Sequence, residues 1–209
     1  MKNFVLKGEN LRINFIRRRN IFSGINISVT KSEIVGVSGE NGSGKTTLLK
    51  ILSGILRPTE GDVSLSIDGI VLKRDEITSH IGFVSPYLVL YEEFTPMEHL
   101  KLFAKFRGVD FNRKETMNLL EEFNLHKRYN DMIKTFSSGM KQRVKYMIAL
   151  QTRPEVFFLD EPFTNLDDAG IDSVKRIIEQ HVTDGGGVLL ASNDEREKQL
   201  CSRFVELHN

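Results

Sequence analysis

Residues 39–46 read Gly39-Glu40-Asn41-Gly42-Ser43-Gly44-Lys45-Thr46, which fits the pattern G-x-x-x-x-G-K-[ST] of phosphate-binding loops. The apolar run Ile34 to Val37 before it predicts a buried strand, and apolar residues at helical spacing follow it from Thr46 to Leu56. Strand, loop and helix are the order that such a loop requires. The alternative, a glycine-rich turn that binds nothing, is disfavoured by these flanking elements. The stretch therefore predicts a nucleotide-binding core.

The residue types in this loop suit a nucleotide and a metal ion. Glycines let the backbone curl until several N–H groups point at phosphate oxygens, and the start of the helix adds its positive end. Lys45 would reach the β- and γ-phosphates, and the Thr46 hydroxyl would ligate Mg²⁺. We expect ATP and Mg²⁺ as ligands, with the nucleotide contacted by Gly39, Glu40, Asn41, Gly42, Ser43, Gly44, Lys45, Thr46 and Thr47.

Two acidic residues end a second apolar strand. Val156 to Leu159 is continuously apolar and is followed by Asp160 and Glu161. In a doubly wound sheet, ligands bind at the carboxyl ends of the strands. We expect Asp160 to hold Mg²⁺ and Glu161 to accept a proton from an attacking water molecule. A strand that ends in acids is common by chance, but beside a phosphate-binding loop it becomes a strong indication of hydrolysis.

The composition narrows the remaining possibilities. The 209 residues are 40% hydrophobic, which is enough for one sizeable core, and 29 Lys and Arg nearly balance 28 Asp and Glu. This balance argues against nucleic acid as a partner. No run is long and apolar enough to span a bilayer, and the first residues lack the apolar stretch of a signal peptide, so a cytosolic protein is expected. Cys201 is interpreted as a half-buried thiol, and the five scattered histidines as surface residues.

The pattern of elements predicts one α/β domain over residues 1–209. An antiparallel hairpin is expected from the apolar stretches at 11–15 and 21–29, which a run of arginines separates. Strands and helices then alternate, which favours a mostly parallel sheet covered on both faces. From about residue 87 to 150 the texture becomes helical. We therefore expect a core formed by residues 1–86 and about 151–209, with a helical subdomain inserted between them.

A third motif resembles a known family. Phe136-Ser137-Ser138-Gly139-Met140-Lys141-Gln142-Arg143 is similar to the signature of ABC proteins, whose common form is Leu-Ser-Gly-Gly-Gln. Asn165-Leu166-Asp167 occupies the place of the family's D-loop, and the motifs follow one another in the family's order from about residue 11 to 207. Taken singly, the segment from Ser137 to Gly139 could be only a helix N-cap.

The resemblance implies a fold, a function and partners. The fold would be a phosphate-loop NTPase core with an N-terminal antiparallel β region and an inserted helical subdomain. Two cassettes, identical or homologous, would close around two ATP molecules, with Ser137 and Gly139 of one chain facing the phosphate loop of the other. Phe15 would stack on adenine, and Asp167 would bridge the dimer. The chain would be the ATPase subunit of a transporter, bound to a separate transmembrane permease on the cytoplasmic face of the cell membrane.

The sequence departs from the family pattern at several positions. Pro86 stands where the family usually has a glutamine, and Asn193 where it has a histidine that contacts the γ-phosphate. Asparagine can donate a hydrogen bond but cannot carry charge or relay a proton. Ser138 and Met140 also differ from the common signature. We expect Glu161 to keep the enzyme active, with Asn193 as a weaker catalytic contact.

Other readings remain open. The chain could be an ATP-sensing module that gates a membrane partner with little turnover, which Pro86 and Asn193 favour and Glu161 opposes. A soluble ABC ATPase acting on ribosomes or DNA usually joins two cassettes or carries a long coiled coil, and a phosphate-loop kinase would lack the signature. The aromatic stretch from Tyr87 to Phe94 is interpreted either as the permease-docking surface or as the core of the helical subdomain.

Overall fold

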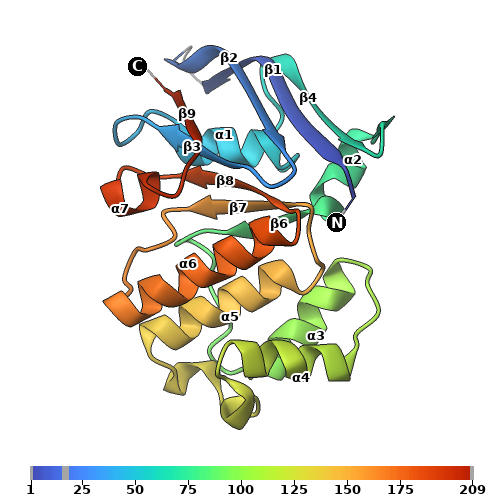
Figure 1. The fold of residues 1–209 in the computed structure, drawn as a ribbon, viewed down its shortest axis with the longest axis vertical. Helices are drawn as coiled ribbons and strands as arrows, with labels where there is room; N and C mark the ends of the chain where they lie inside the picture. The colour runs from blue at the N-terminus through green and yellow to red at the C-terminus, as the bar shows by residue number, and fades with distance from the viewer. Residues whose placement is uncertain (1, 16–18, 208–209) are drawn as a thin grey trace.

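Two sheets form the framework of the molecule, as a computed structural model that describes residues 2–15 and 19–207 shows (Figure 1). The first is antiparallel, in the order β2-β1-β4-β5, from strands Phe4–Phe15 (β1), Arg19–Thr30 (β2), Glu60–Ile67 (β4) and Ile70–Val71 (β5). The second is parallel, in the order β6-β7-β8-β3-β9, from strands Ile34–Ser38 (β3), Ile81–Val84 (β6), Val156–Asp160 (β7), Gly187–Ala191 (β8) and Arg203–Glu206 (β9).

The helix that follows the phosphate loop lies between the two sheets. This helix, α1 (Lys45–Leu52), buries Leu48, Leu49, Ile51 and Leu52 against apolar residues of both sheets. Strands β7 and β8 are buried along their whole length, because helices cover the other face of the parallel sheet. One hydrophobic core thus joins the loop to the sheet edge at which β7 ends.

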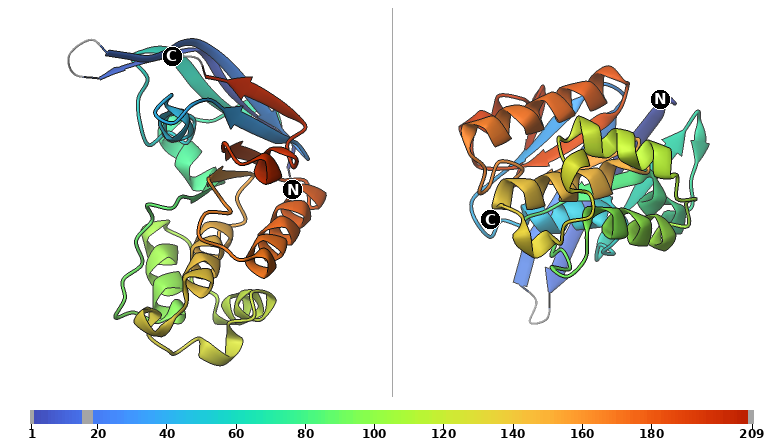
Figure 2. Two further views of the ribbon diagram at one scale, coloured as in Figure 1. Left: turned by 90° about the vertical axis from the view of Figure 1, so that its left-hand side faces the viewer. Right: turned by 90° about the horizontal axis from the view of Figure 1, so that it is seen from below.

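The second core lies among the helices below the parallel sheet (Figures 1 and 2). Its main helices are α3 (Pro96–Phe106), α4 (Arg113–Glu122), α5 (Ser138–Leu150) and α6 (Asp168–Thr183). Short turns of helix complete the described chain: α2 (Arg74–Ile77), α7 (Glu195–Lys198), and 3₁₀ turns at Thr78–His80, His126–Arg128 and Ile133–Thr135. Across the described ranges, none of the helices has the length and apolarity needed to cross a bilayer.

The helices and strands that the sequence predicts are present, but their boundaries are shifted. The hairpin is confirmed, although its strands are longer than expected, and the first helix ends at Leu52, before Gly54 adopts a positive φ of 80°. Cys201 is half-buried, as expected. The interpretation of all five histidines as surface residues was wrong, because His99 and His181 are buried. Both imidazole rings pack inside the helical part of the molecule, and no periodic pattern in the sequence indicates that they are buried.

Candidate active site

Glycine shapes the phosphate-binding loop, because its backbone takes conformations that other residues avoid. Gly39 and Gly44 have φ values of 145° and 100°. A Cβ atom on Gly39 would lie 2.7 Å from the Leu207 carbonyl oxygen, and one on Gly44 would lie 2.5 Å from Cγ2 of Ile21. Gly44 is also the N-cap of α1, whose first turn contains no acidic residue. The N–H groups of that turn can therefore donate to an anion.

Lys45 lies inside the curl of this loop. Its ammonium donates to the carbonyl oxygens of Gly39 at 2.7 Å and Glu40 at 3.2 Å, and the residue is largely buried. Burial lowers the pKa of Lys45, while the nearby Glu161 and Asp160 carboxylates raise it. The cation is thus held inside a glycine-rich loop of the kind that binds phosphate groups.

Asp160 and Thr46 meet at the carboxyl edge of the parallel sheet. The Thr46 hydroxyl donates to Oδ2 of Asp160 at 2.8 Å, and burial raises the pKa of this carboxyl. A hydroxyl and a carboxylate are oxygen ligands of the kind that Mg²⁺ takes beside phosphates. No cluster of three His, Cys, Asp or Glu suited to a metal exists in the described part of the chain. Thr46 and Asp160 supply two oxygen donors, of the kind that the sequence leads us to expect for Mg²⁺ shared with a nucleotide.

The site contains a further hydroxyl group, that of Ser85, which the sequence did not indicate. Ser85 follows β6, is buried, and lies beside Asp160 because Val84 pairs with Leu159 in the parallel register. Its hydroxyl lies 3.5 Å from the Asp160 carboxylate, while the neighbouring Pro86 offers only a backbone carbonyl, which accepts from Lys145 at 3.2 Å. Only the strand pairing reveals Ser85, because a single serine after an apolar run carries no signal of its own.

Glu161 and Asn193 lie at the same edge on neighbouring strands. Asp160 pairs with Ala191, and Glu161 donates its N–H to the Ala191 carbonyl at 2.9 Å. Both side chains are exposed, and the Asn193 amide donates to Oδ1 of Asn41 in the phosphate loop at 3.0 Å. The structure thus brings the predicted catalytic pair together with the loop.

The remaining predicted residues lie at two helix N-termini. Ser137 is the N-cap of α5 and accepts from the Met140 N–H at 3.3 Å, with Gly139 in the first turn. Asp167 is the N-cap of α6 and accepts from the Gly170 N–H at 2.9 Å. Figures 1 and 2 show α5 and α6 below the parallel sheet, on the side opposite α1. Within residues 2–15 and 19–207, no hydrogen bond joins Ser137 or Gly139 to the phosphate loop. Phe15 ends β1, and its side chain lies outside the described residues.

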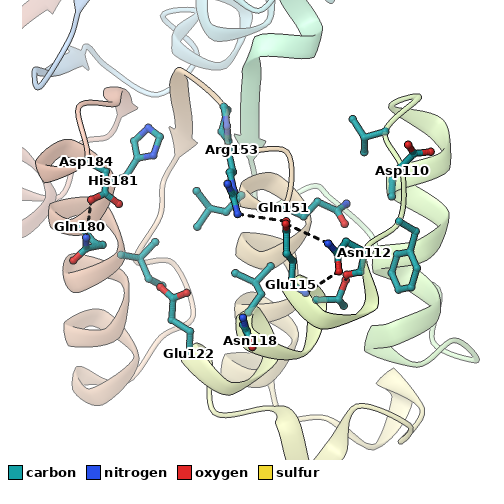
Figure 3. Close-up of a pocket in the computed structure, with 18 residues that line it drawn as sticks. Asp110, Asn112, Glu115, Asn118, Glu122, Gln151, Arg153, Gln180, His181 and Asp184 are labelled. Atoms are coloured by element: carbon teal, nitrogen blue, oxygen red, sulfur yellow. Dashed lines mark hydrogen bonds and ion pairs between the residues drawn. The ribbon is translucent and has the colours of Figure 1, made fainter. Parts of the chain in front are cut away.

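A cavity in the helical part of the described chain lies elsewhere and does not add to this site. Its volume is about 770 Å³, and α4, the turn after α5 and the last part of α6 line it (Figure 3). Several of its polar side chains pair with one another: Glu115 with Arg153 at 3.4 Å and with Asn112 at 3.3 Å, and Gln180 with Asp184 at 2.9 Å. None of the predicted site residues lines it. The candidate active site is therefore the open sheet edge around the phosphate loop.

Comparisons with known proteins agree with this geometry. A family model described as ABC transporter matches residues 22–164. The chain is 33% identical to the uncharacterized ABC transporter ATP-binding protein YcbN of Bacillus subtilis, over 84% of this chain and 57% of that protein. It is 32% identical to EcsA of the same organism, over 92% and 79%, and 34% identical to the daunorubicin resistance ATP-binding protein DrrA3 of Streptomyces coeruleorubidus, over 89% and 60%. The chain thus spans from just over half to about four-fifths of these relatives.

Solved structures give the same result. The ATP-binding subunit of an ABC transporter superposes with a TM-score of 0.84 at 31% identity, over 98% of this chain and 86% of that one. A dimeric ATP-binding cassette in a post-hydrolysis state, bound to ADP and Pi, superposes with a TM-score of 0.82 at 25% identity, over 97% and 94%. These matches confirm the predicted fold class.

Proposed function

We propose that this chain, which belongs to the ABC transporter family of ATP-binding proteins, hydrolyses ATP in a dimer and thereby drives a separate transmembrane permease. ATP binding is common to the family. Hydrolysis by this chain is supported above all by one observation: Thr46, Asp160 and Glu161 converge at one sheet edge beside the phosphate loop, with 2.8 Å between the Thr46 hydroxyl and the Asp160 carboxylate.

Each residue at this edge would have a distinct part in the reaction. Thr46 and Asp160 would hold Mg²⁺, which offsets the charge of the β- and γ-phosphates when it is bound. Lys45 would turn its ammonium from the loop carbonyls to the phosphate oxygens. Glu161, exposed at the same edge, would orient a water molecule and accept its proton. Asn193 would donate an amide hydrogen to the γ-phosphate.

A second cassette would complete each site. Ser137 and the first N–H groups of α5 form an exposed helix start that suits a phosphate, but α5 lies on the other side of the parallel sheet from α1. A single chain therefore carries the phosphate loop and the N-terminus of α5 on different sides of the parallel sheet. Ser137 and Gly139 of one chain would clamp the ATP bound by the other, with Asp167 at the contact between them. A related cassette has been solved as a dimer.

The permease would dock on the outward face of residues 87–91. Tyr87, Val89 and Tyr91 are exposed, whereas Leu90 between them is buried in the helical core. This alternation favours docking over the reading of the whole stretch as core, because the outward side chains leave a row of apolar surface. Ion pairs of Glu92 with Lys141 at 2.7 Å and of Glu93 with Lys134 at 2.8 Å tie the end of the segment to α5 and the turn before it. Docking would place the chain on the cytoplasmic face of the membrane.

Steady-state ATP hydrolysis with Mg²⁺, measured over a range of protein concentrations, tests this function. We expect a rate that rises more than linearly with protein, because two chains must meet. Glu161→Gln should abolish turnover and leave ATP affinity unchanged, since the amide keeps the shape of the side chain but cannot accept the proton. Wild-type turnover in this variant would remove Glu161 from the mechanism. Intact ATP binding with no turnover in the wild type would favour the ATP-sensing module.

A further inference from the structure

The turn that carries Glu161 has an unfavourable backbone conformation. Glu161 has a positive φ of 49°, which few residues with a side chain adopt, and the Thr164 N–H closes the turn on the Glu161 carbonyl at 3.2 Å. Such a conformation persists only where surrounding contacts hold it. On the side before Glu161, the bond from its own N–H to the Ala191 carbonyl is one such contact.

On the side after Glu161, two buried side chains hold a single peptide group at both of its polar ends. The Tyr146 hydroxyl donates to the Pro162 carbonyl at 3.2 Å, and the Phe163 N–H donates to Oε1 of Glu197 at 2.6 Å. Tyr146 comes from α5 and Glu197 from α7, and 0% and 1% of their surfaces are exposed. The peptide plane between Pro162 and Phe163 is thus fixed from two separate elements.

This arrangement leaves Glu161 little freedom. The ring of Pro162 fixes its own φ angle, and the clamped peptide fixes the angle that follows. With the Glu161 N–H bound to Ala191, the backbone is held immediately before the residue and again one peptide group beyond it. The direction in which the Glu161 side chain leaves the backbone therefore depends on the two bonds to the Pro162–Phe163 peptide.

We propose that Tyr146 and Glu197 are positioning residues for ATP hydrolysis, which hold the Pro162–Phe163 peptide and through it the Glu161 carboxylate. The inference rests on the proposed role of Glu161. Neither side chain touches the reacting atoms. Both act through the backbone of the turn, and an error of about 1 Å in the position of a catalytic group can reduce a rate by roughly a hundredfold.

The bond that Glu197 makes to the turn requires an acceptor oxygen at this position. Burial raises the pKa of this carboxyl, and the Asp194 and Glu161 carboxylates raise it further, against the lowering effect of hydrogen bonds from Ser192 and the Phe163 N–H. A neutral side chain with an oxygen in the same place should therefore serve. Glu197→Gln keeps that oxygen, whereas Glu197→Met keeps the approximate volume and removes it.

Hydrogen exchange of the Phe163 amide and ATP turnover, measured on the same variants, test the proposal. Glu197→Met should speed exchange at Phe163 and lower kcat about tenfold or more, with ATP affinity unchanged. Glu197→Gln should keep slow exchange and most of the turnover. Tyr146→Phe, which keeps the buried ring and so the fold, should also lower kcat. Combined with Glu197→Met, it should lower kcat by less than the product of the two effects, because both bonds hold one peptide.

A matched control separates positioning from general loss of stability. Ile178→Val removes a methylene from the buried face of α6, far from the clamp in the chain, and should leave kcat and Phe163 exchange unchanged. Exchange and kcat of Glu197→Met equal to those of this control would overturn the proposal. Glu161→Gln is assayed beside these variants. If the wild type hydrolyses ATP no faster than Glu161→Gln, the proposed function fails. Hydrogen exchange at Phe163 then still shows whether Tyr146 and Glu197 hold the Pro162–Phe163 peptide.

Discussion

One amide side chain, that of Asn193, occupies a position in the site where the family pattern has a histidine. Asn193 uses one of its two amide hydrogens on Oδ1 of Asn41, at 3.0 Å. The second hydrogen remains available to a γ-phosphate bound in the loop. The bond to Asn41 also orients the amide, so the contact is preformed although the side chain is exposed. A neutral donor of this kind stabilises negative charge less than a protonated histidine does.

We therefore predict that Asn193→Ala lowers kcat roughly tenfold or more, because it removes a donor to charge that develops in the transition state. Asn193→His should raise kcat above the wild-type value. Steady-state kinetics with a separate measurement of ATP affinity would check both variants. Asn41→Ala is the matched control, since it frees the Asn193 amide without deleting it, and its effect should be smaller. A wild-type rate for Asn193→Ala would exclude the contact.

At the scale of elements, a buried histidine holds the segment that precedes α3. Nε2 of His99 accepts from the Tyr91 N–H at 2.9 Å, and Nδ1 donates to the Thr95 carbonyl at 3.0 Å. The ring also packs against the rings of Tyr91 and Phe94. Both nitrogens are committed in the neutral form, and burial lowers the pKa of His99. A proton on Nε2 would face the Tyr91 N–H and break the bond.

We therefore predict that lowering the pH weakens the bond between His99 and Tyr91, which holds the segment before α3. The unfolded chain takes up a proton at the ordinary histidine pKa of 6.5, before native His99 does, so stability falls as the pH drops below that value. Thermal melts between pH 7.5 and 5.5 should show this loss, together with faster hydrogen exchange at Tyr91. In His99→Gln, whose oxygen can accept the same bond without titrating, the loss should be smaller. Burial also lowers the pKa of His181, so some pH dependence should remain in that variant. Equal pH dependence in the two proteins would contradict the prediction.

How well an element could be predicted depends on how local its cause is. The phosphate loop is eight consecutive residues, and Asp160 directly follows an apolar run, so both are visible in the sequence. Ser85 carries no such signal, because its partner Asp160 is set by a fold in which β6 lies beside β7. The partners of His99 are near it in the chain, at Tyr91 and Thr95, but no motif marks them. Tyr146 and Glu197 meet one peptide from helices about fifty residues apart in the chain, and no spacing rule connects them.

At the scale of the molecule, the docking surface proposed for the permease and the proposed ATP site belong to different parts of the chain. The predicted division into a core and a helical subdomain at residues 87–150 remains a prediction. Helix α5 packs against both β6 and α3, so it joins the two parts physically. The docking surface proposed above lies at the start of the helical part, directly after β6.

We predict that a photo-crosslinking residue at Val89 captures an integral membrane protein in cells that express the chain. The same residue at Ile70 should capture none, although Ile70 is 70% and Val89 81% exposed, because β5 lies in the antiparallel sheet at the far side of α1. Mass spectrometry of the crosslinked products identifies the partner. Crosslinks to membrane proteins from position 70 and not from 89 would place the permease on the opposite face.

The ion pair between Glu92 and Lys141 has a mechanical consequence. It links the docking segment to the first turns of α5, where Ser137 and Gly139 would meet the ATP of the neighbouring cassette. A displacement imposed by the membrane protein would therefore reach α5 in part through this exposed bond, which dissolved salt screens. Raising the ionic strength should therefore weaken the coupling between ATP hydrolysis and transport, while ATP hydrolysis itself continues.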